Sequence, residues 1–292
     1  MSTLTIPERL FARRILVPTD LGPDGDRAFA HALRLAAAIP EEVTLTLIHV
    51  GGGPDDAREI MADMPQVRTA LERWGLIPPG SPRAAVGQLG LAINKVVAED
   101  GDPVEAILDF IEKTGVDLLV VGTRGDHGLP HWLARSISET IARNIHAPTL
   151  FVPRGATGFV DEESGAVTMR RVLSPVSWEP HPARAISGAV AAASAFGGAN
   201  AEVTLFHVGS DDDRPTLALP EIEGVSYEWR GGAEGDVVDA ILAEARRAPT
   251  DLITMVTTGR DNFLDSVRGT DTERVIRHAP CPVLAAPAHG GS

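Results

Sequence analysis

The segment Asp117-Leu118-Leu119-Val120-Val121-Gly122 carries the clearest signal of the fold. A continuous apolar run of this length is typical of a parallel β-strand that helices cover on both faces. The preceding Asp102-Pro103-Val104-Glu105 is a favourable helix start, with an N-cap aspartate, a proline at the first position and a glutamate three residues on. Apolar residues then recur with the spacing of one helix face through Ile111. A helix that leads directly into a buried strand is the repeating unit of α/β folds.

Three more apolar runs in the first half have the length of strands: residues 15–17, 43–50 and 149–152. Residues 28–38 lie between the first two runs and have a helical pattern. Strands that alternate with helices predict a mostly parallel sheet with helices on both faces. In such sheets, ligands bind beyond the carboxyl ends of the strands, at the point where the strand order reverses.

The sequence is duplicated. Residues 13–18 (RRILVP) recur 157 residues later as RRVLSP, and residues 47–51 (LIHVG) recur 158 residues later as LFHVG. Residues 101–108 (GDPVEAIL) recur 134 residues later as GDVVDAIL, and the same offset relates Asp117 to Asp251. Landmarks that match in the same order indicate a repeated structural unit.

The duplication predicts two tandem α/β domains, each a doubly wound, mostly parallel five-stranded sheet. We expect the first domain over residues 1–155 and the second over residues 166–292. The change of offset places about 24 extra residues in the first domain, as an insertion around residues 52–85 that contains a segment of helical composition. Residues 154–165 have the glycine-rich and acidic composition of a linker.

Charge and cysteine content exclude several classes of function. The formal net charge of −14 at pH 7 disfavours sequence-independent binding to nucleic acid or to an anionic membrane. The single cysteine, Cys281, excludes an intramolecular disulfide and a multi-cysteine metal site, and we expect it to be a small buried residue. No apolar run has the length of a membrane helix and the first residues lack a signal-peptide pattern, so we expect a cytoplasmic protein.

A phosphate-binding loop without lysine is predicted after the strand at residues 117–121 and after its counterpart in the second half. Glycine lets backbone N–H groups approach a ligand closely, and a helix that begins just beyond offers further free N–H groups. In each half, nine residues separate a loop glycine, Gly125 or Gly259, from the residue just before the helix start, which is residue 135 or 269. The residues concerned are Gly122, Gly125 and Ser136 in the first half, and Gly259, Gly269 and Thr270 in the second.

Simpler interpretations of these residues remain open. Ser136 and Thr270 each begin a capping box with a glutamate three residues later, which explains them without a ligand. Gly122 and Gly125 could be turn glycines only. His49 and His207 recur at the ends of matched strands, where we expect packing or backbone hydrogen bonding.

The chain resembles the universal stress protein family twice over, along essentially its full length. The resemblance rests on the glycine motif of that family, G-x2-G-x9-G-[S/T], and on the ending Pro280-Cys281-Pro282-Val283-Leu284. In ATP-binding members, an aspartate at the end of the first strand contacts the adenine, and the resemblance assigns this position to Asp20. It also assigns Val50 to the wall of the adenine pocket. It further implies that the two halves form an internal pseudo-dimer that pairs through the last strands.

Each half departs from the family pattern. Arg135 stands where the family has its third glycine, and it could either add charge beside a phosphate or fill the space that glycine leaves. In the second half, Val256 replaces the first glycine and Ser177 replaces the adenine-contacting aspartate. The first half is therefore the better candidate for a nucleotide site.

The resemblance implies a non-catalytic stress-response regulator that binds ATP or a related adenine nucleotide in the first domain, with at most weak ATP hydrolysis. Asp20 and Asp126 could together hold Mg²⁺ near the phosphates, whereas His127 and His131 lack an evident third metal ligand. No nucleophile–base arrangement is apparent, so we name no catalytic residue. The alternative is a degenerate protein-interaction module that binds no nucleotide, and the sequence names neither its protein partner nor whether it forms a homodimer.

Overall fold

A computed structural model describes residues 12–53, 55–99, 101–123, 147–156, 158–198, 200–233, 235–257 and 271–288. The first half contains β1 (Arg14–Pro18), α1 (Pro23–Ala38), β2 (Val43–Val50), α2 (Ala57–Asp63), α3 (Val67–Arg73), α4 (Ala84–Gln88), β3 (Leu91–Ala98), α5 (Pro103–Thr114), β4 (Leu118–Thr123) and β5 (Thr149–Pro153). Three of these helices, α2, α3 and α4, precede the edge strand β3.

The second half repeats this order without the extra helices before its edge strand. It contains β6 (Arg171–Pro175), α7 (Ala183–Phe196), β7 (Ala201–Val208), the 3₁₀ turn η3 (Asp211–Asp213), β8 (Val225–Ala233), α8 (Val237–Arg247), β9 (Leu252–Thr257), α10 (Asp271–His278) and β10 (Val283–Pro287). None of the helices in the described parts of the chain is long and apolar enough to cross a membrane.

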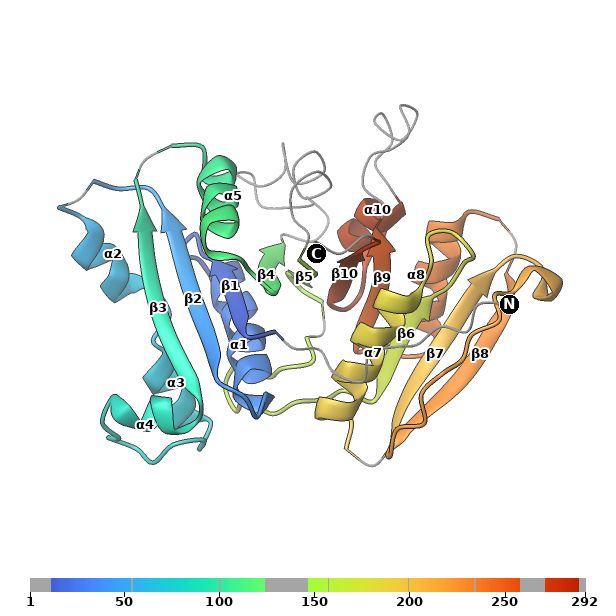
Figure 1. Cartoon of the computed structure of the whole chain (residues 1–292), viewed down its shortest axis with the longest axis horizontal. Helices are drawn as coiled ribbons and strands as arrows, with labels where there is room; N and C mark the ends of the chain where they lie inside the picture. The colour runs from blue at the N-terminus through green and yellow to red at the C-terminus, as the bar shows by residue number, and fades with distance from the viewer. Residues whose placement is uncertain are drawn as a thin grey trace.

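The strands of the two halves join into a single ten-stranded sheet, with the order β3-β2-β1-β4-β5-β10-β9-β6-β7-β8 (Figure 1). Neighbouring strands within each half are parallel. The two last strands, β5 and β10, pair antiparallel, with Leu150 opposite Leu284. The predicted α/β fold is therefore confirmed, and so is the internal pseudo-dimer. The two five-stranded sheets are continuous with each other through this pair.

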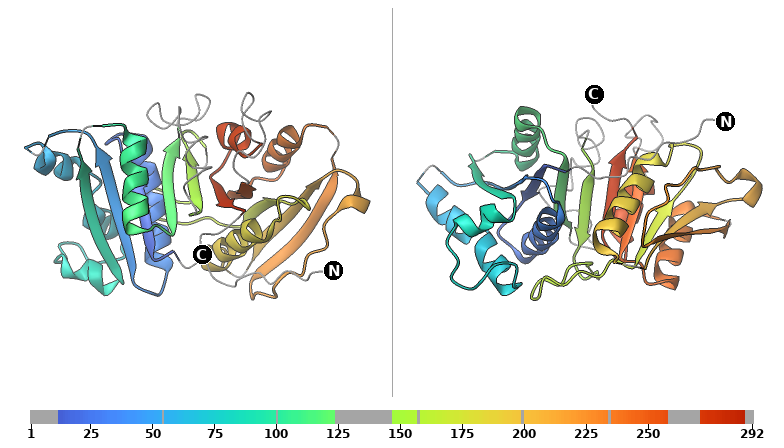
Figure 2. Two further views of the ribbon diagram at one scale, coloured as in Figure 1. Left: turned by 45° about the horizontal axis from the view of Figure 1, so that its top comes forward. Right: turned by 60° about the horizontal axis from the view of Figure 1, so that its bottom comes forward.

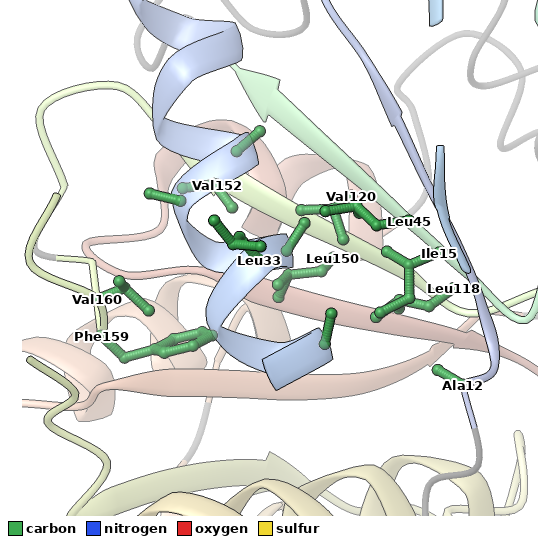
Figure 3. Packing of buried hydrophobic residues seen from close by; sticks show 14 of the residues in the cluster. Ala12, Ile15, Leu33, Leu45, Leu118, Val120, Leu150, Val152, Phe159 and Val160 are labelled. Carbon is green, nitrogen blue, oxygen red and sulfur yellow. The ribbon is translucent and has the colours of Figure 1, made fainter. Parts of the chain in front are cut away.

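Helices cover both faces of the sheet. On one face, α1 and α7 lie on either side of the central strands (Figure 2). On the other face, α5, α8 and α10 pack on the same strands. The apolar run in β4 explains the arrangement, because successive side chains of a strand point to opposite faces. Leu118 and Val120 belong to the core under α1, which Figure 3 shows, whereas Leu119 and Val121 belong to the core under α5.

Two pairs of aspartates hold equivalent parts of the two halves. Asp117 accepts hydrogen bonds from the backbone N–H groups of Arg13 and Arg14 at 3.0 and 2.9 Å, and so fixes the start of β1 beside β4. Asp251 does the same at the start of β6, at 2.6 and 2.9 Å. Asp102 and Asp236 are the N-caps of α5 and α8, and each side chain accepts two backbone N–H groups of the first helical turn.

Two parts of the first half differ from the sequence-based expectation. Helix α1 begins at Pro23, five residues before the predicted start, because proline fits the first position of a helix. The segment expected to be a linker contributes to the core. Phe159 and Val160 are buried, and Val160 forms an antiparallel bridge with Val167. Apolar side chains in this connection thus hold it against the sheet.

Candidate functional site

The strand order predicts a ligand-binding crevice between the carboxyl ends of β1 and β4. The chain passes from β1 to β2 and β3 on one side and then returns to β4 on the other side of β1. This is the switch point at which open parallel sheets bind ligands. Asp20 follows the end of β1, and Gly122 is the second-last residue of β4, which ends at Thr123. Two of the residues that the sequence predicts for the site therefore lie at its expected position.

Asp20 belongs to a short, ordered connection between β1 and α1. Its Oδ1 accepts a hydrogen bond from the backbone N–H of Gly22 at 3.1 Å. Thr19 is buried, and its Oγ1 accepts the N–H of Leu21 at 3.0 Å. Leu21 has a φ of 60°, in the left-handed region that non-glycine residues rarely adopt. These bonds fix the half-buried carboxyl group of Asp20 relative to the end of β1, and they show that it braces the loop.

A second carboxyl group of the first turn of α1 faces Asp20. The pKa of Asp26 is raised, first because burial disfavours its charged form and second because the negative charge of Asp20 lies near it. A bound group that donates hydrogen bonds or carries positive charge would relieve this repulsion. The end of β1 and the start of α1 thus bring two acidic side chains close to each other.

Gly122 is required for packing. It lies within β4, so it is not a turn glycine, and a Cβ at this position would overlap the backbone oxygen of Asp24 in α1. The buried side chain of Asp24 is also within 3.5 Å of Arg154 Nε. The missing side chain thus lets the N-terminus of α1 approach the end of β4. Thr123 Oγ1 is buried at the same strand end and has no bonding partner among the described residues.

The end of β2 forms another side of the crevice. Val50 is half-buried and packs against the core on the α5 face. It is followed by Gly51 and Gly52, both with positive φ, which turn the chain away from the sheet. His49 Nδ1 lies 2.8 Å from the backbone oxygen of Thr19, so this histidine ties the end of β2 to the Asp20 loop. The expected backbone hydrogen bonding of His49 is confirmed.

The equivalent crevice in the second half is built differently. Ser177 Oγ donates a hydrogen bond to the backbone oxygen of Glu179 at 3.0 Å. The next residue, Trp178, donates its Nε1–H to the backbone oxygen of Asp213 at 2.8 Å, so it joins the β6–α7 connection to η3. Sequence analysis did not single out Trp178, since its partner lies 35 residues away. Val256 stands at the position of Gly122, where it adds a side chain.

The histidine of the second half keeps its structural role. His207 Nδ1 lies 3.0 Å from the backbone oxygen of Val176, which confirms the expected backbone hydrogen bonding. The free cysteine, Cys281, is fully buried, as expected, and burial raises the pKa of its thiol. No group of three or more potential metal ligands occurs among the described residues.

Several predicted site residues lie outside the described residues. They are the phosphate-loop candidates Gly125, Arg135, Ser136, Gly259, Gly269 and Thr270, together with Asp126, His127 and His131. The described part of the site therefore comprises the adenine end of the predicted pocket, around Asp20, Val50 and Gly122. There, the described residues supply a half-buried carboxylate at the end of β1 and a half-buried valine at the end of β2.

The two halves define a duplicated α/β protein whose parallel strands reverse their order at a switch point in each half. The family model for the universal stress protein family matches residues 12–153 and again residues 168–287. The chain belongs to the universal stress protein family, as a member with two tandem domains.

Individual relatives agree with this assignment. The universal stress protein MJ0531 of Methanocaldococcus jannaschii is 27% identical over 147 residues, which cover 49% of this chain and 82% of that protein. The crystal structure of a universal stress protein from Archaeoglobus fulgidus has a TM-score of 0.61 at 18% identity, and it covers 96% of this chain and 100% of that chain. The second likeness shows that the whole two-domain arrangement is shared.

A family member solved in complex with cAMP is 22% identical, with a TM-score of 0.31, over 48% of this chain and 97% of that chain. Cyclic AMP is an adenine nucleotide, so at least one family member binds a ligand of this class.

Proposed function

We propose that this protein is a cytoplasmic, non-catalytic regulator of a stress response that binds ATP or a related adenine nucleotide in its first domain. The observation that carries the proposal is the position of Asp20 at the switch point between β1 and β4, where its Oδ1 accepts a hydrogen bond from the N–H of Gly22. Asp20 would accept a hydrogen bond from the adenine amine, and Val50 would pack against the ring.

The phosphates would extend toward the segment that follows β4, where the sequence motif places Gly125, Arg135 and Ser136. Mg²⁺ would accompany a triphosphate, with Asp126 as its candidate ligand near the phosphates. In this proposal, the nucleotide is a regulatory ligand, and the protein's own residues bind and orient it. The signal would then pass to a protein partner through the arrangement of the two halves.

In the second domain, we propose that no nucleotide binds. Ser177 offers a hydroxyl group where the first domain offers a carboxylate, and that hydroxyl group is occupied by Glu179. Trp178 and Val256 take space at the ends of β6 and β9. These features favour the protein-interaction module for this half.

The proposal is tested by calorimetric titration of nucleotide-free protein with Mg-ATP. Replacing Asp20 with alanine removes one partly buried hydrogen-bond acceptor, which should cost roughly 1–3 kcal/mol of binding free energy. This corresponds to about 5- to 150-fold weaker binding. Asp20→Asn leaves one side-chain oxygen, which would have to accept hydrogen bonds from both the Gly22 N–H and the adenine amine. This substitution should therefore weaken binding as well.

Ser177→Ala is the matched control, because it changes the equivalent position of the second domain and should leave the affinity unchanged. Absence of heat and of any thermal shift at millimolar ATP would contradict nucleotide binding by this chain. Equal weakening by Asp20→Ala and Ser177→Ala would contradict its assignment to the first domain.

A further inference from the structure

A cavity of about 310 Å³ lies between the two halves, beside the C-terminal parts of α1 and α7 and the first residues of β4 and β9. One wall is the C-terminal end of α1, with Leu35, Ala38 and Ile39. The other wall is α7, which contributes Ala191 and Ala192 among other small residues. The strands β4, β5, β9 and β10 each supply one leucine to its floor. The cavity therefore spans the junction at which β5 pairs with β10.

Its lining is almost entirely apolar. Glu41 and Ser194 are the lining residues with polar side chains, and no arginine, lysine or histidine of the described residues lines it. A buried water needs two to four polar partners, so most of this space is poorly suited to water. Its volume falls at the lower end of the range for small-molecule sites in proteins, which are concave and mainly apolar.

Phe159 closes one end of the cavity. It packs edge-on against His31 of α1, with ring centroids 4.6 Å apart, and lies 6.4 Å from the ring of Phe196 in α7. Figure 3 shows Phe159 on the same side of the sheet as α1, with Leu150 and Leu118. The connecting segment thus lies against the helices of both halves at this end of the cavity.

The small side chains of α7 create the space. The two helices correspond at an offset of 157 residues, so Leu35 matches Ala192. His31 matches Gly188, where a Cβ would lie 2.7 Å from Leu284 Cδ2 of β10. The side chains of α7 therefore extend less far into the cavity than those of α1. The helix α7 itself packs closely on the sheet.

We propose that this cavity is a second ligand site, which takes the alkyl chain of an uncharged amphiphile. The apolar walls match a hydrocarbon chain. A carboxylate head group would find no basic partner among the described lining residues. Because the ligand would touch α1 and α7 together, its binding would stabilise the junction of the two halves, independently of any nucleotide.

The test uses the full chain and the neutral fluorescent probe N-phenyl-1-naphthylamine, displaced by 1-octanol. We expect saturable displacement by octanol and at least about tenfold weaker displacement by octanoate. Ala192→Phe fills the cavity from α7 and should abolish probe binding. Ala38→Phe fills it from α1. Because Ala38 is exposed, this substitution tests the same site without requiring the core to repack.

Ala183→Phe is the matched control, since Ala183 begins α7 but does not line the cavity. Its probe binding should equal that of the parent, and thermal unfolding should show that all variants fold. Unchanged binding in both cavity-filling variants would overturn the proposal, as would octanoate that binds as tightly as octanol. Binding that appears only after deletion of residues 2–11 would also overturn it, because the chain's own N-terminal segment, which leads to the lining residue Ala12, would then be the occupant.

Discussion

The two strand-end crevices of this protein share their framework and differ in the residues that would meet a ligand. Asp117 and Asp251 brace the first strand of each half, and His49 and His207 bond to equivalent backbone oxygens. Each of these residues stabilises the fold with or without a ligand. The residues that differ, Asp20 against Ser177 and Gly122 against Val256, lie at the switch points.

The comparison teaches that one duplicated unit can keep its fold while its two sites diverge. In the first half, Gly122 lets the N-terminus of α1 come close to β4, and Asp20 offers a carboxylate. In the second half, Val256 occupies that position, and Trp178 ties the loop across to Asp213. A ligand in one half and none in the other would give the pseudo-dimer a functional asymmetry.

Gly122→Ala should have the largest effect on the free energy of unfolding, because it adds a side chain at the position where the two halves differ. The new methyl group would overlap the backbone oxygen of Asp24, which cannot move without shifting α1. Overpacking against backbone should cost more than about 3 kcal/mol of unfolding free energy. Chemical denaturation measures this, with Gly87→Ala in α4 as the control, because no atom lies within 4 Å of a Cβ there. A tolerated Gly122→Ala would show that α1 does not need the close approach.

The next effect concerns His31, which has no titratable counterpart in α7. Burial lowers its pKa from 6.5 to about 4, despite the bond from its ring to the backbone oxygen of Arg27. The folded state therefore favours neutral His31. Its contribution is fully present above pH 6.5 and is lost as the pH falls from 6.5 toward 4. Since one pH unit corresponds to about 1.4 kcal/mol, up to about 3 kcal/mol of unfolding free energy depends on it.

Denaturation at several pH values between 4 and 7 measures this effect. His31→Gln should flatten the pH dependence in that interval. His278→Gln, at an exposed position of α10, should leave it as in the parent. Identical pH dependence in His31→Gln and the parent would mean that protonation of His31 does not determine the loss of unfolding free energy in acid.

The smallest effect sharpens the comparison of the two frameworks. Asp102→Ala removes the N-cap of α5 and should cost about 1 kcal/mol of unfolding free energy. Asp236→Ala removes the equivalent cap of α8 and also two hydrogen bonds from Arg274, at 3.0 and 3.1 Å. We expect the second substitution to destabilise slightly more. A smaller loss for Asp236→Ala in urea denaturation would show that the Arg274 pair adds nothing.

The sequence predicts the fold well because its signals are local. The apolar run at residues 118–121, the Asp-Pro start of α5 and the repeated landmarks each depend on neighbouring residues, and the structure contains the strands and helices that they indicate. The duplication also led, through the family resemblance, to the pairing of the last strands. Residues 154–165 have the composition of a linker because glycines and acidic residues outnumber the two apolar residues that are buried there.

The site is only partly predictable, because its contacts join segments that are distant in the sequence. Asp20 and Val50 could be assigned from strand ends and resemblance. The packing role of Gly122 depends on Asp24, which lies nearly 100 residues before it. The hydrogen bond of Trp178 depends on where η3 places a backbone oxygen. Neither contact leaves a periodic or motif-like signal.

The most direct test of the functional asymmetry is the number of nucleotides bound per chain. Equilibrium dialysis of the full protein against radiolabelled ATP with Mg²⁺, at saturating concentration, gives this number. The account predicts one nucleotide per chain, with the value unchanged in Ser177→Ala and the bound nucleotide lost or greatly weakened in Asp20→Ala. Two nucleotides per chain would show that the second domain is a functional site. No bound nucleotide would contradict the proposed function altogether.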